Sequence, residues 1–192
     1  MCFGVLANRS QRSIPNPHGE GIMRSLFSLL IGIFLSGCAA NYQQQVLKDA
    51  TSKLERGKGV FISTPKNGWY GKTEYKDSGK ITANSMKAAF ARFSNNIYVT
   101  EECLELQCLK IIPTAQYVYY VNPEILHWED RATEWSGIPD KLEIKISIYD
   151  AKLGTELAST VIIGKSKWAT FGGDHPQDLL PEPVNKYVES LY

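Results

Sequence analysis

The segment Glu124–Asp140 holds the densest set of chemically capable side chains in this sequence. It places two tryptophans, one histidine, one arginine and five acids within seventeen positions. A second polar cluster follows at 164–168 and 172–181. Tryptophan and arginine are enriched where proteins bind partners. We therefore predict one binding surface from these residues: His127, Trp128, Glu129, Asp130, Arg131, Glu134, Trp135, Lys165, Lys167, Asp174 and His175.

A purely structural interpretation of the same turn also stays open. Trp128 would then end a buried strand, and Arg131 would hold the carboxylate of Glu129 or Glu134 as a two-pronged ion pair. Trp135 belongs to the turn itself, where we expect its side chain to be exposed. A binding turn and a turn packed on a neighbouring hairpin are both retained as hypotheses.

Glu129 and Glu134 have the residue types of a glycoside-cleaving acid pair, with Trp128 and Trp135 available to stack on sugar rings. That chemistry requires a carboxylate separation of ~5–9 Å, which spacing in a sequence does not set. The chain also contains no Gly-x-Ser-x-Gly nucleophile motif. We predict no catalytic residues, and keep binding or hydrolysis of envelope glycans or a small ligand as the alternative function.

Histidines beside carboxylates suit zinc, and the residues of that kind are His127, Glu129, Asp130, Asp174 and His175. The two histidines lie far apart in the sequence, and no His-x-x-x-His or similar close spacing occurs. More often such residues make salt bridges and loop hydrogen bonds. We therefore predict neither a metal site nor a cofactor.

Cys103 and Cys108 are separated by four residues. In an oxidising compartment this pair would form a disulfide, which requires a bent segment that Pro113 permits. On a straight helix the same spacing would point the two thiols apart and leave them free. We favour the disulfide, and the absence of a Cys-x-x-Cys motif excludes a thioredoxin-like role.

Residues 23–37 have the pattern of a secretory signal, with Met23–Arg24 before the apolar run Leu26–Leu35 and small residues at its end. The run is about half the ~20 residues that a membrane-spanning helix needs. The string Leu35-Ser36-Gly37-Cys38 resembles the lipobox of bacterial lipoproteins. The resemblance implies diacylation of the Cys38 thiol, cleavage before it and a third acyl chain on its new amine. Ala39, in place of an aspartate, implies the outer membrane.

The first 22 residues precede a complete signal, so we interpret them as an over-extended gene start. Cleavage before Cys38 leaves 155 of the 192 residues. Three arginines and one glutamate leave with the removed segment, which changes the formal net charge from +1 to −1. A nucleic-acid-binding protein carries a basic surplus, so the charge balance argues against that class.

Helices are predicted where apolar residues recur at helical spacing. A first helix is expected from Val46 to Leu54, ended by Gly57 and Gly59, after a lipidated polar tether at 38–45. A second is expected after a loop at 65–79, capped by Asp77 or Ser78, with a buried face of Met86, Ala89, Phe90 and Phe93. A closing helix with Pro181 in its first turn would bury Leu180, Val184, Tyr187, Val188 and Leu191. Residues 101–116 suit a short helix that Pro113 would break.

Strands are predicted from β-branched runs and from alternation. Short strands are expected at 60–64 and 97–100, and a long central strand is expected from 117 to 128. Leu142, Ile144, Ile146 and Ile148 alternate with polar residues, which is typical of a half-buried strand. Its hairpin partner is expected at 156–168.

The order of these elements predicts an α/β fold of the α+β sandwich type. We expect a mixed β-sheet of about five strands with helices packed on it, and a C-terminal β-hairpin followed by the closing helix. Residues 46–192 would form this single periplasmic domain. The order is similar to that of the N-terminal domain of the Tol-Pal propeller protein and of curli-export-type lipoproteins.

The strings at 124–140, 164–168 and 172–181, including Trp-Glu-Asp-Arg-Ala-Thr-Glu-Trp-Ser-Gly at 128–137, resemble a family of uncharacterised Gram-negative lipoproteins defined by a domain of unknown function. The likeness runs from about Gly59 to Tyr192 and is strongest over 123–192. It implies a lipoprotein and brings no assigned activity.

These observations together predict an outer-membrane lipoprotein that faces the periplasm and carries a non-enzymatic interaction or assembly domain. Its expected partners are the membrane, through the lipid anchor, and an envelope protein. Nucleic acid is not expected.

Overall fold

The computed structural model describes residues 40–131, 138–166 and 175–192. The chain divides between Gly37 and Cys38 into two units, and every described residue belongs to the second. The described residues begin at residue 40, so Cys38, the signal segment and the predicted gene-start segment lie outside them. Within the described part, no helix is long and apolar enough to cross a membrane.

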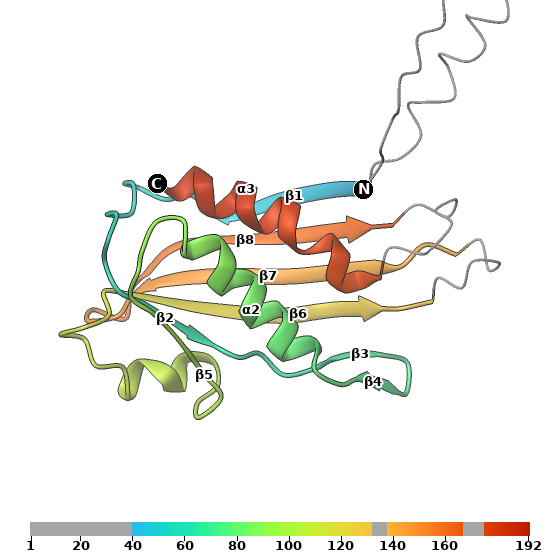
Figure 1. Ribbon diagram of the computed structural model, residues 1–192, viewed down its shortest axis with the longest axis horizontal. Helices are drawn as coiled ribbons and strands as arrows, with labels where there is room; N and C mark the ends of the chain where they lie inside the picture. Colours follow the sequence, from blue (N-terminus) through green and yellow to red (C-terminus); the bar gives the residue numbers. More distant parts are fainter. Residues whose placement is uncertain (1–39, 132–137, 167–174) are drawn as a thin grey trace, which may run out of the picture. The chain divides into compact units, whose positions relative to one another are not determined.

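A six-stranded mixed sheet in the order β1-β8-β7-β6-β2-β5 forms the centre of this unit (Figure 1). The pairs β1–β8, β8–β7 and β7–β6 are antiparallel, while β2 pairs in parallel with both β6 and β5. The bounds are β1 Asn41–Lys48, β2 Val60–Ser63, β5 Ile97–Thr100, β6 Tyr119–Glu129, β7 Lys141–Asp150 and β8 Glu156–Lys165. The predicted fold class, a mixed sheet covered by helices with a closing C-terminal helix, is confirmed.

The hairpin of β7 and β8 follows directly from alternation in the sequence. Residues on one side of β7, including Leu142 and Ile148, are fully buried, while the intervening side chains point to the other face. Ile144 pairs with Ile162 of β8, so the apolar faces of the two strands coincide. On its other side β7 pairs with the long strand β6, whose register shifts between Ile125 and His127 because Leu126 is inserted as a bulge.

Helices α2 (Ser78–Phe90) and α3 (Pro181–Leu191) cover one face of the sheet (Figure 1). Met86, Ala89 and Phe90 of α2 are buried there, as helical spacing predicts. Helix α3 begins at Pro181, and its buried side chains are the ones that the sequence pattern selects. The two helices and the even-numbered residues of β7 share one hydrophobic core.

The opposite face carries a smaller apolar cluster beneath a short 3-10 helix, η2 (Glu105–Lys110). A disulfide joins Cys103 to Cys108, with 5.1 Å between the two Cα atoms, and closes this segment over Phe61 and Tyr120. The ambiguous stretch 101–116 is therefore a bent, covalently closed segment.

The helix expected from Val46 to Leu54 is wrong. Asn41–Lys48 form the edge strand β1, which pairs antiparallel with β8, and the domain boundary predicted at Val46 moves back to Asn41. Four apolar residues in nine positions make a weak helical signal, and a helix this short is only marginally stable in isolation. Pairing with the free edge of β8 satisfies the backbone instead. Residues 41–45 of the predicted polar tether therefore belong to β1.

The loop expected at 65–79 contains a two-stranded hairpin, β3 (Gly68–Tyr70) and β4 (Thr73–Tyr75). Gly71 turns the chain with φ of 59°, a conformation that favours glycine in tight hairpins. Asp77 precedes α2 in a left-handed conformation and makes no side-chain cap. Ser78 instead accepts a hydrogen bond from the Gly68 backbone amide, which fastens the hairpin to the helix.

Replacing both Cys103 and Cys108 with serine is expected to lower the free energy of unfolding by about 2 kcal/mol, because the unfolded chain loses a short covalent loop. Urea titration followed by tryptophan fluorescence measures the change. Treatment of the unmutated protein with a reductant serves as the control and should give a similar loss. An unchanged midpoint in both would contradict a stabilising role for this bridge.

Candidate functional site

Most of the predicted binding residues that the structure describes gather at one end of the sheet. His127, Glu129, Asp130 and Arg131 belong to the end of β6 or follow it directly, and Lys165 ends the neighbouring hairpin. His175 comes immediately before a second 3-10 helix, η3 (Pro176–Leu179). Four other predicted residues lie outside the described residues: Glu134, Trp135, Lys167 and Asp174.

Trp128 does not belong to this surface, which corrects the prediction. Only 2% of the residue is exposed, because its side chain points into the helix-covered core. Gly68 of β3 lies directly on it: a Cβ added to Gly68 would come within 2.5 Å of the Trp128 Cβ. The structural interpretation of this tryptophan, as the end of a buried strand, is the one that the structure shows.

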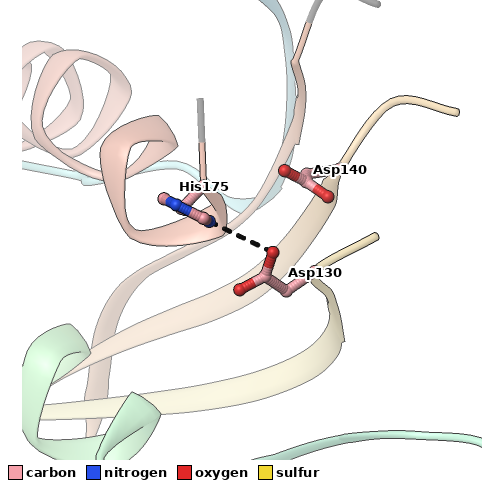
Figure 2. A group of neighbouring side chains, drawn as sticks. All are labelled: Asp130, Asp140 and His175. Carbon is pink, nitrogen blue, oxygen red and sulfur yellow. Dashed lines mark hydrogen bonds and ion pairs between the residues drawn. The ribbon is translucent and has the colours of Figure 1, made fainter. Parts of the chain in front are cut away.

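Asp130, Asp140 and His175 come together from three separate segments at this end of the sheet (Figure 2). The Nδ1 atom of His175 lies 3.2 Å from an Asp130 carboxylate oxygen. One ligand-type atom from each of the three residues lies within 4.8 Å of the others, and an imidazole with two carboxylates suits zinc or manganese. Asp130 and His175 already form an ion pair with each other, so protein contacts account for them.

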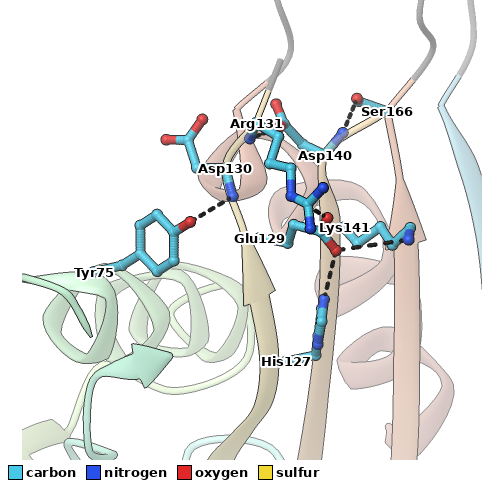
Figure 3. Close-up of polar contacts among 8 residues, drawn as sticks. All are labelled: Tyr75, His127, Glu129, Asp130, Arg131, Asp140, Lys141 and Ser166. Carbon is cyan, nitrogen blue, oxygen red and sulfur yellow. Dashed lines mark hydrogen bonds and ion pairs between the residues drawn. The ribbon is translucent and has the colours of Figure 1, made fainter. Parts of the chain in front are cut away.

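The fully buried Asp140 ties together the ends of three strands (Figure 3). Its carboxylate accepts a hydrogen bond from the Arg131 backbone amide at 2.5 Å. Its own backbone amide donates to the Ser166 hydroxyl at 2.8 Å, and its carbonyl accepts from the Ser166 amide at 3.0 Å. Asp140 ends the segment singled out in the sequence but was not among the predicted site residues, because its role depends on strand register.

Glu129 is the centre of a charged group that it forms with His127, Arg131 and Lys141 at this end of the sheet (Figure 3). Its side chain is 3% exposed, yet three cationic or protonatable groups reach its carboxylate. Arg131 Nε lies 2.7 Å from Oε1, His127 Nε2 lies 2.9 Å from Oε2, and Lys141 Nζ lies 3.6 Å from Oε2. A buried carboxylate requires such partners because desolvation of an unpaired charge costs several kcal/mol.

Tyr70 of the β3–β4 hairpin completes the group from the side. The Arg131 guanidinium lies 4.3 Å from the centre of the Tyr70 ring, and the His127 ring meets the same ring edge-on at 5.4 Å. Cation–π contacts of this kind add about 0.5–1 kcal/mol at exposed sites. Tyr70 was not among the predicted site residues, because no pattern in residues 65–79 indicates that this segment folds back onto β6.

A separate small cavity of about 150 Å³ lies beside β6, between Ser63, Asn122 and Leu126. Beneath it the Tyr120 hydroxyl donates to the Glu105 backbone carbonyl at 2.6 Å and lies 2.9 Å from Ser63 Oγ. Burial raises the pKa of Tyr120 to about 12. The cavity is smaller than the ≈ 300–1,000 Å³ of typical small-molecule sites, and its polar base is fully hydrogen-bonded.

A family model described as "Domain of unknown function (DUF4823)" matches residues 52–191. The predicted resemblance to a family of unknown function is confirmed at that level. No curated protein matches the sequence.

Among solved structures, a PelC dodecamer from Paraburkholderia phytofirmans is similar, with a TM-score of 0.54, 14% sequence identity and coverage of 77% of this chain and 96% of that chain. A PelC variant from the same organism gives a TM-score of 0.55 at 14% identity, covering 79% and 98%. Lipoprotein GNA1162 from Neisseria meningitidis gives a TM-score of 0.46 at 13% sequence identity, covering 69% of this chain and 96% of that chain. At these identities the PelC likeness establishes a shared fold.

Replacing Arg131 with glutamine is expected to lower the free energy of unfolding by about 1–2 kcal/mol, because the buried Glu129 carboxylate loses its shortest contact. In a Glu129→Gln background the same change should cost less than about 0.5 kcal/mol. Lys141→Gln is the matched control, since its amine is more distant and exposed, and it should change stability by less than about 0.5 kcal/mol. Equal effects of Arg131→Gln in both backgrounds, measured by urea titration, would show that the two residues are not coupled.

The Asp130 carboxylate raises the pKa of His175 above its ordinary value of 6.5, chiefly through their hydrogen bond. A raised folded-state pKa means that the pair stabilises the protein fully below pH 6.5 and loses this effect as pH rises through the folded value. The contribution should stay below about 1 kcal/mol because both groups are partly exposed. Titration by NMR should give His175 a higher pKa than in an Asp130→Asn variant. Identical titration curves would contradict the ion pair.

Proposed function

Because this chain belongs to the DUF4823 family, whose function is unknown, we propose its role from its own residues: it is a lipid-anchored outer-membrane protein that faces the periplasm. Its α/β domain acts as a non-enzymatic assembly module that associates with further copies of itself. The acyl chains on Cys38 hold the protein at the membrane, and the folded domain supplies the contacts between subunits.

The observation that carries this proposal is the short stretch of sequence between Cys38 and the first residue of β1. Asn41 is already paired with Lys165 in β1, only three positions after the lipobox cysteine. The boundary between the two units of the chain falls at the bond that a lipoprotein signal peptidase would cleave. Cleavage there would leave every described strand and helix in place, and two or more acyl chains suffice for stable membrane attachment.

The likeness to PelC supports self-association. Structures of that protein are dodecamers, and the shared fold covers nearly its whole length. In the described part of this chain, Leu104 and Leu126 line the same small cavity and are 36% and 48% exposed. Exposed apolar side chains that cluster on a folded domain are typical of protein–protein contacts.

The non-enzymatic role is supported by the way the candidate acids are used. Glu129 is buried against Arg131 and His127, and Asp130 is paired with His175. Glu124, at the mouth of the cavity, is paired with Lys145. Each of these three described carboxylates therefore has a partner that explains its position without a substrate, while Glu134 and Asp174 lie outside the described residues.

Replacing Cys38 with serine is expected to abolish incorporation of a labelled fatty acid and to release the protein from the membrane fraction, because the thiol is the acyl acceptor. Cys103→Ser with Cys108→Ser is the matched control and should retain label and membrane attachment. Persistent labelling of the Cys38→Ser protein would contradict the anchor.

Crosslinking in intact cells is expected to capture multiples of the mature chain, and light scattering of the purified lipoprotein in detergent should give the same oligomer. A strictly monomeric protein in both measurements would contradict self-assembly. Turnover of an envelope glycan by the purified protein would contradict the non-enzymatic assignment.

A further inference from the structure

Strand register aligns four strand ends at one end of the sheet, and one of them begins three residues after the predicted acylation site in the sequence. Asn41 pairs with Lys165, Lys165 pairs with Lys141, and Lys141 pairs with Glu129, so four strand ends form one row. We call this row, together with the tip of the β3–β4 hairpin, the anchor end; in Figure 1 it is the end where β1 begins. The opposite end carries the turn between β7 and β8, where Leu153 is 70% exposed.

The length of chain between Cys38 and the row limits how far the row can lie from the membrane. Three peptide steps separate Cys38 from Asn41, and fully extended they span at most about 11 Å. Acyl chains on Cys38 would fix that residue at the headgroup level. Asn41, at the β1 end of the row, therefore cannot move away from the lipid surface by more than this short distance, while the tilt of the sheet decides how far the other strand ends lie from it.

Two orientations satisfy such a tether: the strands can stand away from the surface, or the sheet can lie on its β1 edge. The residues exposed on the two surfaces favour the first orientation, in which the strands stand away from the membrane. The outer edge strand presents amides at Gln43, Gln44 and Gln45, and its exposed apolar residues and its lysine (Val46, Leu47 and Lys48) lie at the end of the strand away from Asn41. The anchor end presents Trp69, which is 56% exposed, and Ile138, which is 41% exposed, with lysines at the strand ends. Tryptophan and lysine are the residues that favour the membrane–water interface.

We infer that the anchor end of the sheet faces the lipid headgroups, with the strands directed away from the membrane and the β7–β8 turn farthest from it. The inference rests on the proposed acylation of Cys38. Ten residues of β7 span about 30 Å, so the two ends of the domain should differ strongly in their distance from the bilayer. The Glu129 group would then lie at the membrane side of the domain.

Lipid proximity at single introduced cysteines tests the orientation. Cys38 is acylated under the proposal and Cys103 is bonded to Cys108, so one added cysteine takes up a fluorophore alone. Lys165→Cys and Lys141→Cys report on the anchor end. Asp49→Cys, just after β1, reports on the far end of the edge strand, and Leu153→Cys on the far turn.

The labelled full lipoprotein is placed in phosphatidylcholine vesicles that contain headgroup spin-labelled lipid, and quenching is compared between positions. We expect several-fold stronger quenching at Lys165 and Lys141 than at Asp49 and Leu153. Strong quenching at both Lys165 and Asp49 would show a domain lying on its β1 edge and would overturn the inference. Equal quenching at all four positions would overturn it as well.

Mass measurement of the same preparation separates this failure from failure of the anchor. An acylated protein with the wrong quenching pattern refutes the orientation alone. A protein without acyl chains on Cys38 refutes both the anchor and the orientation that depends on it.

Discussion

Register along the antiparallel half of the sheet determines which side chains meet at the anchor end. Pairing of β1 with β8, of β8 with β7 and of β7 with β6 aligns Asn41, Lys165, Lys141 and Glu129 in one row. A shift by one residue would turn the alternating isoleucines of β7 out of the core, so burial of this face fixes the register strongly. The charged group and the start of β1 are therefore held together by the same core packing that stabilises the sheet.

Contacts of the charged group around Glu129 connect segments that strand pairing alone does not hold together. Glu129 forms an ion pair with Arg131, which follows the end of β6, and Arg131 contacts Tyr70 of the β3–β4 hairpin. Asp140 binds the Arg131 amide and pairs with Ser166, which joins the ends of β6, β7 and β8. A buried carboxylate is costly without partners, and these contacts satisfy Glu129 while they hold the described ends of β6, β7 and β8 together.

Local patterns in the sequence were sufficient where one face of an element is buried. The alternation at 142–148 identified β7, and helical spacing identified α2 and α3, because these patterns report directly on core contacts. Local patterns did not predict the structure where the contact partners of a residue or strand are distant in the sequence. The strand β1 depends on a free edge of β8, Tyr70 on a hairpin that folds onto β6, and Asp140 on the register of three strands. The segment 128–137 stood out in the sequence, and its described part forms a structural group around buried Glu129, with Trp128 in the core.

The account depends most on the claim that the working molecule begins at an acylated Cys38, directly before the first strand. Mass spectrometry of the N-terminal peptide from the membrane-purified protein tests it most directly. The account predicts a peptide that starts at Cys38 and carries the mass of its acyl chains. An unmodified peptide that extends upstream of Cys38 would contradict it.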